Sequence, residues 1–120
     1  MDFHGNYDIT GFTQDLGLTI EEVSNLYAEL INEINSALIE LNFLMTKRDL
    51  IKIQKIIHNI KGVSGNYRII DIYRETTKIN DALKSTNYTT LEKDLHHLFD
   101  VSNMAILEIK SFFNQNSIFI

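Results

Sequence analysis

The chain contains no proline, and after Gly17 it has only two glycines, Gly62 and Gly65. Proline and glycine supply most of the turns that sandwiches, barrels, collagen-like chains and disordered chains require. With 44% hydrophobic residues among 120, the chain has enough apolar surface for one core. We therefore expect one all-α domain over residues 1–120, in which the two central glycines are the unusual feature.

Apolar periodicity predicts a short N-terminal helix followed by four amphipathic helices. The expected helices run from Ile9 to Leu16, from about Ile20 to Met45, from Thr46 or Asp49 to about Asn66, from Ile69 to Thr86, and from Leu91 to Phe112. The short connections between the four longer helices predict an antiparallel up-down-up-down four-helix bundle.

Capping residues indicate where these helices begin and end. Thr19 and Thr89 are each followed three residues later by glutamate, the pattern of a capping box. Gly17 and Asn66 are residues that tolerate the left-handed backbone at a helix C-terminus. The aromatic residues mostly fall at predicted core positions: Tyr27, Phe43, Tyr73, Phe99, Phe112 and Phe113.

The chain lacks cysteine, which excludes disulfides, thiolate nucleophiles and cysteine metal sites. Residues 1–5 show no basic region followed by an apolar run, and no stretch approaches 18 uninterrupted apolar residues. We therefore expect a cytoplasmic protein that does not bind a membrane.

Positive charge is concentrated in the middle of an acidic chain. The segment from Lys47 to Arg68 holds six basic residues and one acid, a net +5, while the whole chain is −5, so the remainder carries −10. Overall acidity argues against a general nucleic-acid binder. The local basic segment instead favours an acidic or phosphorylated partner.

His58 falls on the wrong side of its predicted helix for a core residue. On a helical wheel it lies about 150° from the apolar face, so we expect it to be exposed. The residues that share its stripe at helical spacing are Ile51, Gln54, Lys55, Lys61, Gly62 and Gly65. Both central glycines therefore lie beside one exposed imidazole.

Two explanations of these glycines are open. Each glycine costs about 0.8–1 kcal/mol relative to alanine inside a helix. Gly62 could let a neighbouring helix approach, and Gly65 could loosen a helix end. Alternatively, both could keep side chains away from His58, so that another protein can reach it. Four basic residues fall within about 80° of His58 on the wheel, namely Arg48, Lys55, Lys61 and, if the helix persists, Arg68; Lys47 would join them if the helix starts early. Cations on either side of an exposed imidazole suit a histidine that carries a phosphoryl group with about two negative charges.

The segment from His58 to Tyr67 strongly resembles the motif of the histidine-containing phosphotransfer (HPt) domains of two-component phosphorelays. That motif has histidine, an aliphatic residue two positions later, then lysine and glycine, a small residue or serine, and often asparagine and a hydrophobic residue. The matching residues are His58, Ile60, Lys61, Gly62, Ser64, Asn66 and Tyr67. Family members often have a small residue two positions after Asn66, where this chain has Arg68.

The resemblance implies a phosphoryl-group carrier rather than an enzyme. His58 would be the phosphoacceptor, Lys61 would stabilise the phosphoryl group, and Gly62 would leave room for the partner. Ser64 would help to orient the helix through a hydrogen bond. Asn66 would support the site, and the partner-binding surface would comprise Gln54, Lys55, Gly62 and Gly65.

The partners implied are receiver domains of a hybrid histidine kinase or of response regulators. The receiver would bring Mg²⁺, and the chain would need no cofactor or metal of its own. It shows no glycine-rich phosphate loop. We expect it to act as a monomer and not to bind nucleic acid.

Two other functions are compatible with the sequence. The chain could be a helical adaptor that docks receivers or other proteins without being phosphorylated. It could also be a metal-binding bundle that uses His96 and His97. Adjacent histidines on a helix point about 100° apart, however, which makes them a poor chelating pair.

Overall fold

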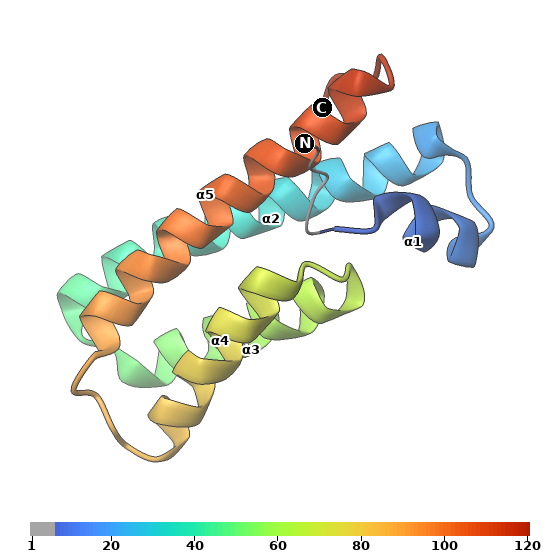
Figure 1. Cartoon of the computed structure of the whole chain (residues 1–120). Coiled ribbons are helices and arrows are strands. Elements are labelled where there is room, and N and C mark those ends of the chain that lie inside the picture. The colour runs from blue at the N-terminus through green and yellow to red at the C-terminus, as the bar shows by residue number, and fades with distance from the viewer. Residues whose placement is uncertain (1–6) are drawn as a thin grey trace.

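The computed structural model describes residues 7–120, so the segment 1–5 considered above lies outside the described residues. The described chain is all-α, with five helices and no strand (Figure 1). The helices are α1 (Ile9–Leu16), α2 (Ile20–Lys47), α3 (Leu50–Asn66), α4 (Ile70–Lys84) and α5 (Leu91–Gln115). None of these helices of residues 7–120 is both long and apolar enough to cross a membrane.

The four longer helices enclose one apolar core. α2 packs against α3 and α5, α4 packs against the same two helices, and α1 packs against α2. Figure 1 shows α5 running along α2, with α3 and α4 together on one side of that pair. α3 contributes Ile53, Ile57 and Ile60 to the core, and all three are buried. The opposite side of α3 is therefore left to carry the candidate site.

Two predicted helix starts are confirmed. At the start of α2, the Thr19 hydroxyl accepts a hydrogen bond from the backbone N–H of Glu22, and the Glu22 carboxylate accepts one from the N–H of Thr19. This reciprocal pair is a capping box. Of the two candidates for α3, Asp49 is the N-cap, and its carboxylate accepts a hydrogen bond from the N–H of Lys52.

The predicted cap of α5 is wrong by one residue. The N-cap is Thr90 instead of Thr89, and it makes no side-chain capping hydrogen bond. The Thr90 hydroxyl donates instead to the Asp94 carboxylate, at 2.8 Å. Asp94 is buried, so the Thr90 hydroxyl satisfies a buried carboxylate oxygen and does not cap the helix backbone.

The helix ends differ more from expectation. Gly17 has φ +69° and closes α1 as predicted, but Asn66 is simply the last residue of α3. The left-handed residue after α3 is Arg68, with φ +60°, and a second arginine, Arg48, closes α2 with φ +55°. Arg48 and Arg68 therefore lie outside α3 and do not extend the basic stripe beside His58.

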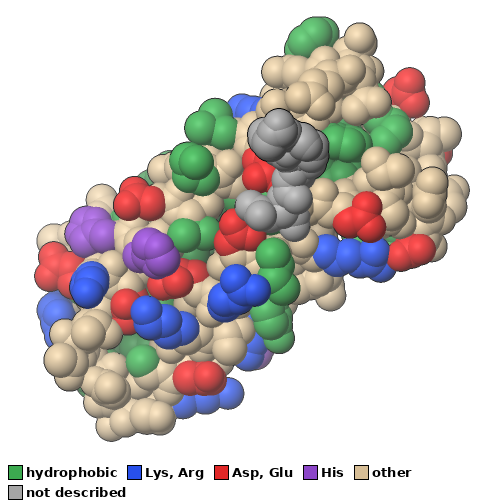
Figure 2. Space-filling model, viewed as in Figure 1, with side chains coloured by type: hydrophobic (Ala, Val, Ile, Leu, Met, Phe, Trp, Pro, Cys, Tyr) green, Lys and Arg blue, Asp and Glu red, His purple; other side chains and the backbone are tan. Residues whose placement is uncertain are grey.

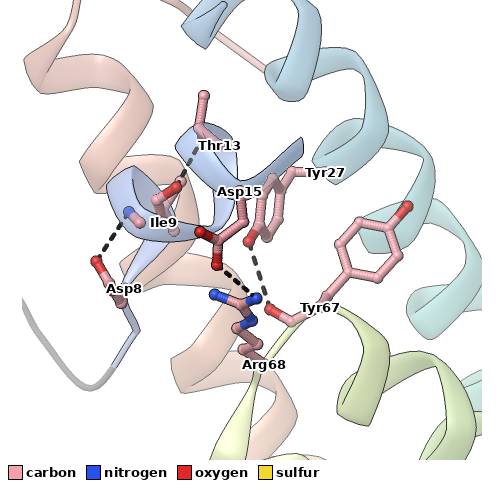
Figure 3. A network of polar contacts seen from close by, with 8 residues as sticks. Asp8, Ile9, Thr13, Asp15, Tyr27, Tyr67 and Arg68 are labelled. Atoms are coloured by element: carbon pink, nitrogen blue, oxygen red, sulfur yellow. Dashed lines mark hydrogen bonds and ion pairs between the residues drawn. The ribbon is translucent and has the colours of Figure 1, made fainter. Parts of the chain in front are cut away.

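Side-chain contacts tie the end of α3 to α1 and α2 (Figure 3). The Arg68 guanidinium lies 2.8 Å from the Asp15 carboxylate, and its carbon is 5.2 Å from the centre of the Phe12 ring. The Tyr27 hydroxyl donates to the Tyr67 carbonyl at 3.4 Å, and the two rings are 5.3 Å apart. The helix that carries His58 is thus fixed at its C-terminal end, about two turns beyond the histidine.

Candidate functional site

His58 is exposed, as predicted, in the middle of α3. The helix is positioned by the buried side chains on its other face, which are Ile53, Ile57, Ile60 and Ser64. Since α3 is continuous from Leu50 to Asn66, the spacing that places Lys55 and Lys61 on the His58 stripe holds along its whole length. The core packing therefore presents the imidazole to solvent.

Gly62 borders open space. A Cβ atom built on Gly62 would meet no described residue within 4 Å. Close approach of a neighbouring helix therefore does not account for this glycine in the part of the chain that the structure describes. What Gly62 does leave is a side-chain-free position one turn beyond His58, at the surface.

Gly65 has a packing reason of its own. A Cβ atom on Gly65 would lie 3.0 Å from Cδ1 and 3.1 Å from Cε1 of Tyr73, a residue of α4. The Tyr73 ring therefore packs against the bare backbone of α3. Tyr73 is 39% exposed and Phe43 is 58% exposed. The prediction that these two aromatic residues lie in the core is therefore wrong.

The cations beside His58 differ in their surroundings. Lys55 is exposed, whereas Lys61 is half-buried, and its Nζ lies 6.0 Å from the centre of the Tyr73 ring. Gln54 is half-buried on the same stripe, one turn before the histidine. On the face drawn in Figure 2, basic and acidic side chains are intermixed, so positive charge does not dominate that face.

Ser64 is fully buried and makes a hydrogen bond within its own helix. Its hydroxyl donates to the Ile60 carbonyl at 2.7 Å and lies 3.1 Å from the Lys61 carbonyl. The Ser64 hydroxyl thus finds its hydrogen-bond acceptors within α3 rather than linking α3 to a neighbouring helix. Asn66 is exposed at the end of the helix.

Arg68 is engaged within the molecule, through its ion pair with Asp15 and its contact with Phe12. Lys47 is the last residue of α2. The basic groups that share α3 with His58 and lie on its stripe are therefore Lys55 and Lys61, fewer than the sequence alone suggests.

His96 and His97 lie on α5 and have separate surroundings. Nδ1 of His97 is 3.1 Å from the carboxylate of Glu75, which is buried, whereas the His96 ring contacts Phe99 at 5.9 Å between ring centres. Within residues 7–120, no three histidine, cysteine, aspartate or glutamate side chains gather into a metal-binding group.

A groove lies between α2 and α3, on the flank of α3 away from His58. It is lined by Glu33, Ile34, Ser36, Ala37, Glu40, Ile56, Asn59, Ile60 and Val63. His58 is not among the residues that line it, so the groove is distinct from the candidate site.

Comparison with family models, with curated proteins and with solved structures finds no match to this chain. The likeness to phosphotransfer domains therefore rests on the residues from His58 to Tyr67 and on the helical layout.

Proposed function

We propose that this chain is a histidine phosphotransfer carrier of a two-component phosphorelay. The observation that carries the proposal is the exposed imidazole of His58 beside Gly62, where a side chain would point into open space. A folded helix gains nothing from a glycine at such a position. A partner that must bring its own reactive group up to the imidazole does gain from it.

The packing of α2 to α5 supports the finer fold that the family implies. Each of these helices contacts two of the others, which suits an antiparallel up-down-up-down four-helix bundle with α1 as a short additional helix. In this proposal residues 1–120 form one monomeric cytoplasmic domain. Its partners are the receiver domains of a hybrid kinase or of response regulators.

The transfer chemistry needs one nucleophilic ring nitrogen. The lone pair of a neutral His58 imidazole attacks the phosphorus of the receiver's aspartyl phosphate, forming a nitrogen–phosphorus bond. The phosphorus–oxygen bond to the aspartate breaks, and the carboxylate leaves with that electron pair. The reverse step loads a second receiver. The receiver supplies the Mg²⁺ and the acidic pocket for this exchange.

The remaining site residues have supporting roles. Lys61, and Lys55 one turn before His58, offset the charge of the phosphoryl group. Gln54, Lys55 and Gly62 border the surface on which the receiver docks, and Gly65 lies at its edge. Ser64 and Asn66 support the C-terminal half of α3.

The test is transfer of label from a phosphorylated receiver domain to the purified chain. We expect acid-labile, alkali-stable label on the wild type and on a His96→Gln, His97→Gln double variant, and none on His58→Gln. Label that reaches His58→Gln equally would show that the site is wrong. Receivers that bind the chain but never label it would favour the adaptor function instead.

A further inference from the structure

We propose that Tyr73 is a positioning residue, which holds the Lys61 side chain on the stripe of α3 that also carries His58. This inference rests on the proposed function, because it concerns the lysine that faces the phosphoryl group. It adds a residue from α4 to a site otherwise built from α3 alone. It also explains Gly65, because the Tyr73 ring packs where a side chain would stand.

Tyr73 is held by hydrogen bonds of its backbone within α4 and by packing of its ring on α3. Its backbone lies in the first turn of α4, where its N–H donates to the Ile69 carbonyl at 3.0 Å and its carbonyl accepts from the Thr77 hydroxyl at 2.7 Å. Its ring rests on Gly65, where even a methyl group would come within 3.0 Å of Cδ1. An exposed tyrosine is thereby held against α3.

Lys61 lies one turn before Gly65 on the same stripe of α3, and three residues after His58. Its ammonium group is 6.0 Å from the centre of the Tyr73 ring, at the outer limit of the range of a cation–π contact. A free lysine samples many rotamers around a four-carbon stem. The ring reduces that freedom and keeps the ammonium group on the side of the helix that carries His58.

The consequence for the phosphorylated state is a preorganised charge. A lysine already held on the stripe of α3 that carries His58 loses less conformational freedom when it meets the phosphoryl group. Removing the ring should therefore weaken what Lys61 contributes by about two- to fivefold, the size of an exposed cation–π contact. Removing only the hydroxyl should change nothing, because the ring provides the contact.

The test does not need a receiver domain. Phosphoramidate donates its phosphoryl group directly to an imidazole nitrogen: its phosphorus–nitrogen bond breaks, a new one forms to the ring, and ammonia leaves with a proton. The half-life of the phosphohistidine is then followed by ³¹P NMR, with His58→Gln giving the background from other histidines. We expect Tyr73→Leu to shorten the half-life two- to fivefold and Tyr73→Phe to leave it unchanged.

Three variants separate positioning from a general effect on the fold. Tyr88→Leu removes a tyrosine that is 38% exposed, close to the 39% of Tyr73, and should leave the half-life unchanged. Gly65→Ala should shorten it, since the added methyl group displaces the ring. In a Lys61→Ala background, Tyr73→Leu should have no further effect. An equal effect of Tyr73→Leu in that background would overturn the proposal.

A second readout depends on neither phosphorylation nor partner. The ε-protons of Lys61 should be shifted upfield by the ring in the wild type and in Tyr73→Phe, and this shift should disappear in Tyr73→Leu. An unaltered Lys61 signal in Tyr73→Leu would contradict the contact itself. If the half-life responds as expected but no receiver exchanges phosphoryl groups with the chain, the proposed function fails and the positioning of Lys61 stands.

Discussion

The guanidinium of Arg68 lies 2.8 Å from the carboxylate of Asp15, so that the residue just beyond α3 is clamped to the short helix α1. Arg68 makes this contact from a left-handed backbone conformation, φ +60°, which costs a non-glycine residue about 1–2 kcal/mol. Its side chain offsets that strain through Asp15 and through the ring of Phe12.

Replacing Arg68 should therefore depend on what replaces it. Arg68→Ala keeps the strain and loses both contacts, and we expect it to lower the free energy of unfolding by about 1 kcal/mol. Arg68→Gly loses the same contacts but relieves the backbone, so it should be nearly neutral. Urea titration of both variants checks this. Equal losses for alanine and glycine would mean that the backbone of residue 68 is not strained.

The two central glycines should respond in opposite ways to alanine. Gly62→Ala places a methyl group in open space and should stabilise the protein by up to about 1 kcal/mol. Gly65→Ala gains the same helix propensity but must displace the Tyr73 ring, so its net gain should be smaller or negative. Thermal unfolding compares the pair. A larger gain for Gly65→Ala would show that the ring moves aside at no cost.

A bulkier side chain at position 62 should affect transfer rather than folding. We expect Gly62→Gln to remain folded, as judged by circular dichroism, and to exchange phosphoryl groups with a receiver more slowly. Unchanged exchange rates in Gly62→Gln would remove access to His58 as the reason for the glycine.

Lys61 should matter to the phosphorylated form more than to the fold. Lys61→Ala removes the cation that would pair with the phosphoryl group on His58. An ion pair at a partly exposed site contributes about 1 kcal/mol, so we expect the phosphohistidine half-life to fall roughly fivefold. The matched control is Lys52→Ala, also on α3, whose side chain is 67% exposed and lies 4.0 Å from Asp49. If both variants shorten the half-life equally, only the total charge of the helix matters.

The free energy of unfolding should fall at alkaline pH because Tyr27 and Tyr67 are shielded from water in the folded chain. Burial raises the pKa of the Tyr27 phenol, and burial also raises the pKa of Tyr67. Above about pH 10 the unfolded chain loses these protons while the folded chain retains them, so rising pH favours unfolding. We expect Tyr27→Phe to lose less stability than the wild type between pH 9 and pH 11 in urea titrations. Parallel pH profiles would contradict the shifted pKa of Tyr27.

Asn80 is a buried amide whose nitrogen and oxygen both lack a hydrogen-bond partner among the described residues. Replacing it with leucine removes two unsatisfied groups at similar volume, which should raise the free energy of unfolding by about 1 kcal/mol. Asn80→Ala should instead lower it, because a cavity is left. A loss of stability in Asn80→Leu would show that the amide is hydrogen-bonded in solution, for example to a buried water.

The helices could be predicted from sequence because their signals are local. The Thr19 and Glu22 pair, the glycine at position 17 and the apolar spacing of α3 each act over a few residues. The same local reasoning predicted that His58 is exposed, since a continuous helix with one apolar face leaves its other face to solvent.

The errors arose where sequence signals are weak or distant. Left-handed helix ends are expected at glycine or asparagine, but α2 and α3 are followed by left-handed arginines, Arg48 and Arg68. This ambiguity put both arginines on the basic stripe of α3. The reason for Gly65 is a ring on another helix, Tyr73, and no pattern within α3 reveals it.

The open space around Gly62 also bears on how this position should behave under selection. A library of variants screened only for resistance to heat or protease should replace glycine with alanine at position 62, while retaining small residues at position 65. Under the proposed function, the same library screened for phosphoryl transfer should keep glycine at both positions. Comparing the residues enriched in the two screens would show that position 65 is constrained by the fold, whereas glycine at position 62 is not.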